Sequence, residues 1–280
     1  MGRTASGRNR RPKLGQNFLA DRRAAERIVE ALGELARATV VEIGPGRGAL
    51  TDLLAARAHH LIAIELDRVL GAQLRMRYTA SPNVEILEGD VLDIDFVSLL
   101  RRPRQRPANP QPLAAENVRI VGNLPYYIAS PILLRLLGFH QLFSTVVILV
   151  QREVAERITA KPGSRDYGLL SATVQLYARV EKLFTLPPGA FSPPPKVHST
   201  ALRLTIAPRE KALGVYGKEF LEFLKLSFGQ KRKTLLNNLR TRYQPAAVRA
   251  AMQQAGVKAD ARAEALSLEK AAAVFRELSP

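Results

Sequence analysis

The amino-acid sequence predicts an α/β protein in which a parallel sheet, covered by helices on both faces, is followed by a small all-helical domain. Up to about residue 160, short apolar runs alternate with segments whose apolar residues recur at helical spacing. This alternation favours a Rossmann-like sheet, because parallel strands need helical crossovers that pack on both faces. From about residue 209 onward the spacing is helical throughout.

The alternating segments have the lengths of ordinary strands and helices. Apolar runs rich in Val, Ile and Leu predict strands at residues 39–43, 60–65, 84–88, 118–122 and 145–151. Helical spacing predicts helices at residues 48–58, 67–78, 130–137, 151–160 and 168–178. An earlier helix is expected after Asp21, because aspartate accepts hydrogen bonds from the free N–H groups of a helix N-terminus. Strands at 180–186 and 200–206 flank a proline-rich turn, and we expect an antiparallel pair at the sheet edge.

The chain divides into three parts by composition. Residues 1–12 are polar and basic without periodicity, so we expect a disordered tail. Residues 13–207 hold the alternating pattern, and residues 208–280 form the predicted helical domain. Residues 101–117 contain four prolines and are expected to form a loop. The helical part carries two apolar stripes, made of Phe220, Phe223, Leu224 and Phe228 and of Leu235, Leu236 and Leu239.

The composition excludes several kinds of site and points to a polyanionic partner. No cysteine is present and the four histidines lack metal-ligand spacing, so we predict neither disulfides nor a metal site. No apolar run approaches the roughly 20 residues of a membrane span. The net charge of +17 suits nucleic acid or an anionic membrane surface, with a merely solubilising charge as the alternative. Clustering of the basic residues argues against that alternative. The clusters are Arg3, Arg8, Arg10, Arg11 and Lys13; Arg101, Arg102, Arg104 and Arg106; and Lys231, Arg232 and Lys233.

A glycine-rich turn follows the first strand of the alternating pattern. Gly44, Gly46 and Gly48 lack Cβ atoms, so a ligand can approach the backbone closely. Dinucleotide sites use the spacing G-x-G-x-x-G and hold a pyrophosphate, which the carboxylate of Glu42 would repel. Glu42 suits a cation instead, such as the ammonium group of S-adenosylmethionine. Glu65 ends the next strand, where it can accept hydrogen bonds from two ribose hydroxyls. We therefore predict an S-adenosylmethionine site; a nicotinamide or flavin cofactor and a turn without a ligand are the alternatives.

Asp90 supports the same site from the third strand. It lies just past the run at 84–88, so its carboxylate reaches the same edge of the sheet as Glu65. From there it can accept a hydrogen bond from the exocyclic amine of the cofactor adenine. The alternative is a helix cap or a turn residue, which is the usual role of an aspartate after a strand.

The segment after the fourth strand carries the groups expected to act on a substrate. Asn123 offers a side-chain carbonyl and Leu124 a backbone carbonyl, and two such acceptors match the two N–H bonds of a nucleobase amine. Tyr126 offers a flat face on which an extruded base can stack. Phe191 could stack on the opposite face of the base. The alternatives are a proline turn with a core tyrosine and a buried anchoring phenylalanine.

With these residues in view, the chain resembles the ribosomal RNA adenine dimethyltransferases, a family of class I methyltransferases. Five segments carry the resemblance in order along the chain. They are Leu14 to Leu19, Glu42 to Gly48, Asn123 to Tyr126, Phe191 to Val197 and Phe228 to Leu235. The resemblance implies two successive methyl transfers to each of two adjacent adenines, in a hairpin loop near the 3′ end of 16S ribosomal RNA. It also implies a cytoplasmic monomer that acts on an assembling 30S particle, with RNA contacts from the helical domain.

The resemblance assigns roles to individual residues of this chain. It implies that Asn17 and Leu19 contact the cofactor, which composition could not have indicated. Gly44 would line the methionine part of the cofactor, and Asn123 would lie between the cofactor and the target amine. The remaining cofactor contacts match the roles argued above, with Glu65 at the ribose and Asp90 at the adenine. The 101–117 loop departs from the family pattern because it is longer and more basic.

Three other functions stay open on the sequence alone. A macrolide-resistance methylase acting on 23S ribosomal RNA would share the fold, the cofactor and the target atom. A DNA adenine methyltransferase would more commonly carry proline where Leu124 stands. A non-catalytic assembly or transcription factor on the same scaffold would not need Glu65, Asp90, Asn123 and Tyr126, all of which are present.

Overall fold

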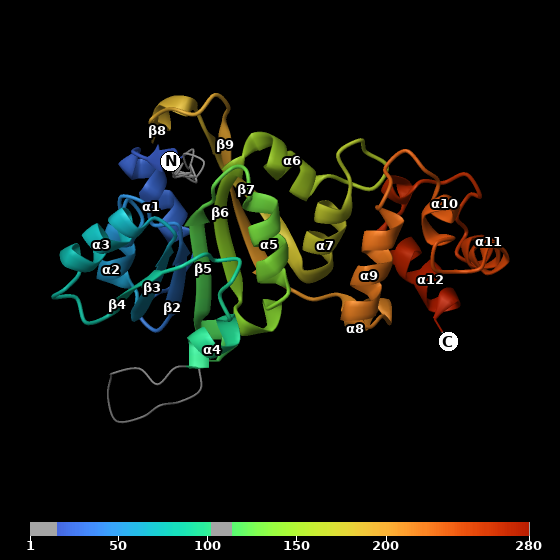
Figure 1. Cartoon of the computed structure of the whole chain (residues 1–280), viewed down its shortest axis with the longest axis horizontal. Coiled ribbons are helices and arrows are strands. Elements are labelled where there is room, and N and C mark those ends of the chain that lie inside the picture. The colour runs from blue at the N-terminus through green and yellow to red at the C-terminus, as the bar shows by residue number, and fades with distance from the viewer. Residues whose placement is uncertain (1–15, 102–113, 280) are drawn as a thin grey trace, which may run out of the picture.

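The computed structural model of the chain describes residues 16–101 and 114–279. The predicted basic tail at residues 1–12 and most of the proline-rich 101–117 segment lie outside these ranges, so the structure says nothing of them. The described chain consists of an α/β part followed by a lobe of helices, shown at the right of Figure 1.

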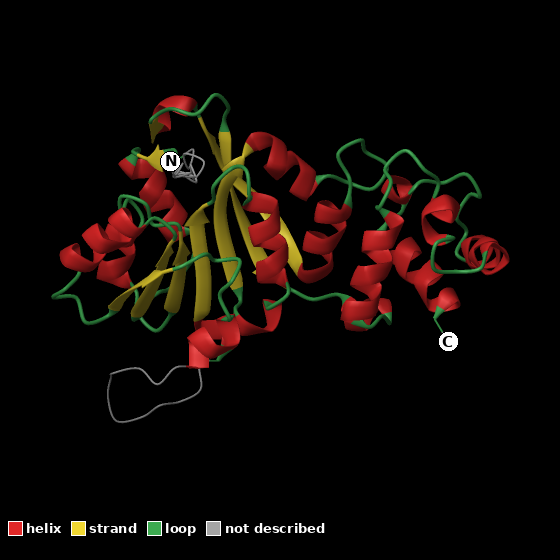
Figure 2. Cartoon of the chain, viewed as in Figure 1, coloured by secondary structure: helices red, strands yellow, loops and turns green. Residues whose placement is uncertain are grey.

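The sheet within the described ranges has seven strands in the order β4-β3-β2-β5-β6-β9-β7 (Figures 1 and 2). The strands from β4 to β6 are parallel, and β9 lies antiparallel between β6 and β7. The parallel sheet and the antiparallel pair at its edge are therefore confirmed. The strands are β2 (Thr39–Ile43), β3 (His60–Glu65), β4 (Val84–Glu88), β5 (Val118–Asn123), β6 (Thr145–Gln151), β7 (Ala178–Leu186) and β9 (Ser199–Ile206).

Apolar side chains on both faces of the strands explain why helices cover both faces of the sheet. Val40 and Val41 are neighbours on β2, and each is 0% exposed. Because successive side chains of a strand point to opposite faces, the two belong to different core clusters. The cluster of Val40 includes residues of α1 and α2, and the cluster of Val41 includes residues of α4 to α7. These helices are α1 (Arg22–Glu30), α2 (Thr51–Arg57), α4 (Phe96–Arg101), α5 (Ala129–Leu137), α6 (Arg152–Thr159) and α7 (Leu169–Tyr177).

Local side-chain chemistry sets several helix boundaries. The Asp21 side chain accepts a hydrogen bond from the backbone N–H of Ala24 at 3.0 Å, so the predicted start of α1 is confirmed. Asp67 caps α3 (Arg68–Arg77) in the same way, directly after β3. Helix α2 begins later than predicted, because Gly48 has a φ of 91°, outside the helical region.

The chain after β9 is helical, as predicted. Helices α9 and α12 pack through tilted phenylalanine rings, with the centroids of Phe220 and Phe275 5.3 Å apart. These phenylalanines belong to the same continuous hydrophobic cluster as the buried residues of α5, α6 and α7. The boundary at residue 207/208 stays a prediction. None of the helices within the described ranges is long and apolar enough to cross a membrane. The helices are α8 (Glu210–Leu213), α9 (Gly217–Ser227), α10 (Leu235–Leu239), α11 (Pro245–Gln254) and α12 (Leu268–Leu278).

A second, two-stranded sheet was not expected from the sequence. Strand β1 (Phe18–Leu19) pairs antiparallel with β8 (Phe191–Ser192), so that Leu19 lies opposite Phe191. Two-residue strands are too short to show a period-2 pattern, and their partners are far apart in the sequence. This pairing brings the segment before α1 to the carboxyl ends of the parallel strands.

Candidate active site at the strand ends

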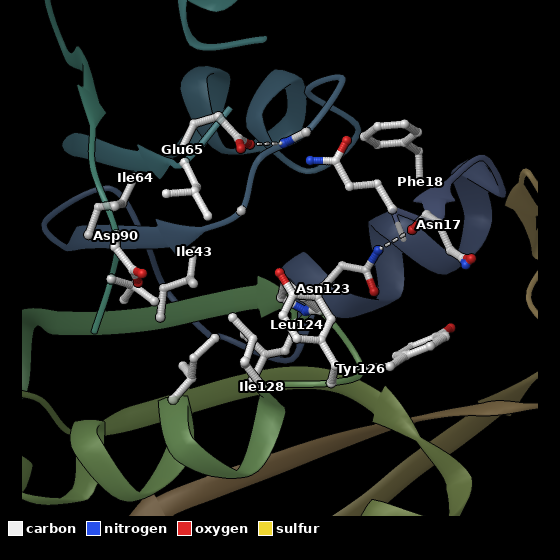
Figure 3. Close-up of a pocket in the computed structure, with 18 of the residues that line it drawn as sticks. Asn17, Phe18, Ile43, Ile64, Glu65, Asp90, Asn123, Leu124, Tyr126 and Ile128 are labelled. Atoms are coloured by element: carbon white, nitrogen blue, oxygen red, sulfur yellow. Dashed lines mark hydrogen bonds between the residues drawn. The ribbon is translucent and has the colours of Figure 1, made fainter. Parts of the chain in front are cut away.

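A solvent-open cavity lies at the carboxyl ends of β2, β3, β4 and β5. This edge is where open α/β sheets bind their ligands. Its wall also includes the segment that enters β1 and the turn that leads to α5. Seven of the nine site residues predicted from the sequence line it: Asn17, Gly44, Glu65, Asp90, Asn123, Leu124 and Tyr126 (Figure 3).

The glycine turn forms the floor of the cavity with little space for side chains. Gly44 and Gly46 have φ angles of 67° and 59°, a region that residues with a Cβ rarely adopt. A Cβ on Gly46 would lie 2.8 Å from Cδ1 of Phe18, which is too close for a real contact. The ring of Phe18 therefore covers the turn, and the guanidinium of Arg47 lies 4.6 Å from its centroid. Glycine is required at 46 both by conformation and by this contact.

Glu65 holds the turn and faces the cavity at the same time. One carboxylate oxygen accepts a hydrogen bond from the N–H of Gly46 and the other from the N–H of Asp67, both at 2.9 Å. The residue is 3% exposed, and burial raises the pKa of its carboxyl. Each oxygen has a second acceptor position, so further hydroxyl donors can bind. These contacts fit the predicted role at a ribose, which stays a prediction.

Asp90 is a turn residue whose side chain also lines the cavity, and its role at the cofactor adenine stays a prediction. One carboxylate oxygen accepts a hydrogen bond from the N–H of Leu92 at 2.9 Å, which makes Asp90 a turn residue. The same side chain lines the cavity near the apolar side chains of Ile43 and Ile64 (Figure 3). An apolar slot with a carboxylate at its end fits a purine ring whose exocyclic amine donates to the acid.

The Asn123 side chain is oriented by the segment before β1. Its amide nitrogen donates a hydrogen bond to the backbone oxygen of Asn17 at 2.9 Å. Because only the nitrogen of the amide can donate, the side-chain oxygen must point the other way. Figure 3 shows that oxygen on the side of Leu124 and Tyr126. The geometry therefore provides the acceptor that the sequence predicts.

Leu124 continues the hydrogen-bond ladder of the sheet beyond the end of β5. Its backbone N–H donates to the oxygen of Leu149 on β6 at 3.0 Å, and its side chain is 1% exposed. Both contacts fix the orientation of the peptide that carries the backbone acceptor. That Leu124 accepts from a substrate amine stays a prediction.

Tyr126 is half-buried at the end of the cavity away from Glu65 and Asp90 (Figure 3). Its hydroxyl is hydrogen-bonded to the hydroxyl of Ser199 at 2.7 Å. Burial raises the pKa of the Tyr126 phenol, so the hydroxyl stays neutral. The next residue, Tyr127, also lines the cavity but is 59% exposed.

Two predicted site residues, Phe191 and Leu19, do not line the cavity. They lie opposite each other in the β1–β8 pair and are 3% and 6% exposed. Both side chains pack in the core beneath α1, together with Ile28. In this structure the Phe191 ring therefore lies as the alternative of a buried anchoring phenylalanine expects, and its stacking on a base opposite Tyr126 stays a prediction. The Leu19 side chain is likewise part of the core and not of the pocket.

Glu42 also differs from its expected place. Its side chain is 1% exposed and does not line the cavity, because residues 42 and 43 point to opposite faces of β2. Burial, reinforced by the nearby carboxylates of Glu65 and Asp52, raises the pKa of Glu42 to about 8. One of its oxygens has no hydrogen-bond partner among the described residues. The idea that Glu42 contacts a ligand cation directly is therefore not supported.

Several lining residues escaped the sequence analysis. Phe18, Ile43 and Ile64 looked like ordinary core residues, because apolar side chains at strand ends give no separate pattern. Tyr127 could have been found, since an aromatic residue next to a predicted stacking tyrosine is a candidate for a second contact. Within the described ranges, no group of three His, Asp or Glu side chains is placed to hold a metal ion.

The residues of the cavity fit S-adenosylmethionine. The glycine turn leaves room beside the backbone, Glu65 offers acceptors at the second strand end, and Asp90 lies at the end of an apolar slot. Together these groups match the methionine, ribose and adenine parts of that molecule.

Comparisons with known proteins identify the family of the chain. Residues 7–279 match the family described as ribosomal RNA adenine dimethylase. A protein of Koribacter versatilis named ribosomal RNA small subunit methyltransferase A is 58% identical, over 99% of both chains. A protein of the same name from Acidobacterium capsulatum is 56% identical, over 98% of this chain and 92% of its own.

Two solved structures resemble the whole chain. A dimethyladenosine transferase from Plasmodium falciparum has a TM-score of 0.74 at 25% identity, covering 92% of this chain and 95% of its own. The 23S rRNA methyltransferase ErmE has a TM-score of 0.66 at 28% identity, covering 94% and 99%. The predicted Rossmann-like methyltransferase fold is thereby confirmed. Matched along nearly its full length, the chain belongs to the ribosomal RNA adenine dimethylase family.

Proposed function

We propose that this protein transfers methyl groups from S-adenosylmethionine to the exocyclic amines of two adjacent adenines in the 3′-terminal hairpin loop of 16S ribosomal RNA. Family membership and the names of the most similar relatives support this activity. The observation that carries the proposal is the orientation of Asn123. Its amide is fixed by Asn17 so that the side-chain oxygen faces the end of the cavity next to Tyr126.

The chemistry follows from the two acceptors. An adenine amine is a weak nucleophile, because its lone pair is delocalised into the ring. Hydrogen bonds accepted by the Asn123 side chain and the Leu124 carbonyl hold the nitrogen and favour its pyramidal form, which localises the lone pair. When bound, S-adenosylmethionine supplies a methyl group already activated by its sulfonium centre. The protein therefore acts mainly by alignment and by fixed dipoles, and the amine proton can leave to water after transfer.

The remaining site residues are assigned by the same proposal. Tyr126 offers its ring face to the extruded adenine. Glu65 binds the ribose of the cofactor and Asp90 its adenine, while Gly44 and Asn17 line the methionine part. Phe191 and the side chain of Leu19 are buried in the core of this structure, away from the cavity.

The proposal extends to the partner and the location. The substrate is the 16S ribosomal RNA of an assembling 30S particle in the cytoplasm, met by the protein as a monomer. The net charge of +17 supports a polyanionic partner. The helical lobe after residue 208 contributes to RNA binding, with the basic cluster Lys231, Arg232 and Lys233 at the turn before α10.

A 23S ribosomal RNA methyltransferase of the ErmE type is the second candidate, because the two structures share a fold over nearly the whole chain. Incubating the protein with labelled S-adenosylmethionine and, in separate reactions, 30S particles, 50S particles or duplex DNA separates these candidates. Label in 16S RNA alone is expected. Label in 23S RNA alone would favour the second candidate, and label in duplex DNA would favour a DNA methyltransferase.

Cells that lack the protein provide the direct test. Mass spectrometry of their 16S RNA should show that two adjacent dimethyladenosines near the 3′ end are missing. The wild-type gene should restore them, and a gene encoding Asn123→Ala should not. Restoration by Asn123→Ala would contradict the hydrogen-bond account. Fully modified 16S RNA in cells without the protein would overturn the proposed substrate.

A further inference from the structure

The hydrogen bond between Tyr126 and Ser199 links the turn after β5 to a distant strand. The two hydroxyl oxygens are 2.7 Å apart, and the residues are 73 positions apart in the sequence. Tyr126 lines the cavity, whereas Ser199 does not. Ser199 is 0% exposed, so its hydroxyl is shielded from water and from any substrate.

Ser199 is held in place by the sheet although it lies next to a loop. It is the first residue of β9, and its neighbours in the sheet are Gln151 on β6 and Leu186 on β7. The residue before it, His198, accepts a hydrogen bond from the N–H of Arg152 at 3.0 Å. Because β9 is paired with a strand on each side, the Ser199 hydroxyl has a fixed position.

Tyr126 lies on a less constrained part of the chain. It belongs to a turn closed by the hydrogen bond from Ile128 to the oxygen of Pro125 at 3.1 Å. The adjacent Tyr127 shows that a ring on this turn can extend into solvent, with 59% of its surface exposed. The hydroxyl contact joins Tyr126 to β9. Stacking by itself does not need a hydroxyl, since a phenylalanine presents the same kind of face.

We propose that Ser199 is a positioning residue for methyl transfer, holding the Tyr126 ring in the orientation in which a target adenine stacks on it. This inference rests on the proposed function, because it assigns Tyr126 to the target base. The hydroxyl of Ser199 touches neither the cofactor nor the base. Burial keeps the Tyr126 phenol protonated at neutral pH, so the pair stays a neutral hydrogen bond.

The test is a double-mutant cycle on the full-length protein. Ser199→Ala, Tyr126→Phe and the double variant are assayed for kcat/KM toward 30S particles that lack the modification. S-adenosylmethionine binding is measured by calorimetry. Each single variant removes the same hydrogen bond from one end, so each should lower kcat/KM roughly 3- to 10-fold. The double variant should be no worse than either single variant, because the contact is already lost. Cofactor affinity should not change.

Thr200→Val is the matched control. Thr200 is the next residue of β9, is 3% exposed, and its hydroxyl bonds to that of Thr185 at 3.1 Å. Its side chain points to the other face of the sheet. Removing this hydroxyl disturbs the same strand to a similar degree but leaves Tyr126 untouched, so kcat/KM should stay within about twofold of wild type.

Three outcomes overturn the inference. Additive losses in the double variant would show that the two hydroxyls act separately. An equal loss in Thr200→Val would show that only the integrity of β9 matters. Full activity in Tyr126→Phe, a change that leaves the buried strand intact, would show that the hydrogen bond is not needed. These outcomes differ from a failure of the proposed function. In that case the wild-type protein itself would methylate no 16S RNA, and the role assigned to Ser199 would be wrong as well.

Discussion

The side-chain nitrogen of Asn123 donates a hydrogen bond to the backbone oxygen of Asn17, 2.9 Å away and 106 positions earlier in the chain. One amide thus performs two tasks. Its nitrogen fastens the segment before β1 to the end of β5, and its oxygen is left facing the substrate end of the cavity. The choice of asparagine over aspartate at this position follows, because a carboxylate could accept from an amine but could not donate to Asn17.

Asn123→Asp is therefore expected to lose activity although it keeps an acceptor. The carboxylate would be repelled by the Asn17 carbonyl and would turn away from its present position. Methyl transfer under single-turnover conditions should fall roughly 10²- to 10³-fold, as it does when one oriented dipole is removed from an active site. Asn123→Ala should fall by a similar factor while RNA affinity is retained. An Asn123→Asp protein with near wild-type rates would show that the contact with Asn17 does not orient the acceptor.

Gly46→Ala tests the contact between the glycine turn and Phe18. The new Cβ would lie 2.8 Å from the Phe18 ring and would add the strain of a positive φ. Calorimetry should show at least a roughly 10-fold loss of S-adenosylmethionine affinity, about 1.4 kcal/mol. Gly33→Ala is the control, because Gly33 has a φ of 80° but nothing within 4 Å of the added Cβ. If the two substitutions lowered cofactor affinity equally, the contact between Gly46 and Phe18 would not contribute to cofactor binding.

Glu42 makes the stability of the protein depend on pH. Its pKa of about 8 lies above the ordinary value of 4.5, because the side chain is buried near other carboxylates. The folded protein therefore keeps a proton that the unfolded chain releases, and stability falls as pH rises from about 4.5 to 8. Glu42→Gln should match wild type near about pH 4 and be more stable near about pH 8, with the difference growing by up to about 1.4 kcal/mol per pH unit between them.

Urea unfolding at the two pH values measures this difference. Glu30→Gln is the control, since Glu30 is exposed on α1 and its substitution should not change the pH dependence. A Glu42→Gln variant that loses stability equally at both values would mean that Glu42 is ionised in the folded protein.

The basic cluster before α10 should contribute to RNA binding through phosphate contacts. Replacing Arg232 and Lys233 by alanine should weaken affinity for 30S particles and reduce the slope of log K against log salt by about one to two units. Lys258→Ala is the control, because Lys258 is an exposed lysine elsewhere on the helical lobe. An unchanged slope in the double variant would place the docking surface elsewhere on the protein.

The pattern of apolar residues was sufficient to predict the parallel strands of the seven-stranded sheet. The strand residues 39–43, 60–65 and 84–88 were predicted with the bounds that the structure has, because short runs rich in Val, Ile and Leu have clear ends. Polar residues at those ends were also predictable as site residues, since Glu65 and Asp90 follow from topology. These predictions needed only local patterns and the rule that parallel strands end at the same edge.

Contacts between distant segments were not predictable in the same way. The β1–β8 pair, the bond from Asn123 to Asn17 and the bond from Tyr126 to Ser199 each join segments more than 70 residues apart. No pattern along the chain encodes such pairs. This is also why the burial of Phe191 could not be decided from the sequence, because it depends on pairing with Leu19 and not on its own neighbours.

The pairing of β1 with β8 has a consequence for the order in which the pocket is completed during synthesis. The wall formed by Asn17 and Phe18 is held by a partner strand at residues 191 and 192, close to the end of the α/β part. A nascent chain that has emerged from the ribosome as far as β6 already has the five parallel strands, but it lacks strand β8, the partner of β1. The wall formed by Asn17 and Phe18 is therefore fixed only after translation has passed Ser192. Most of the protein is synthesised before the complete pocket can bind its methyl donor.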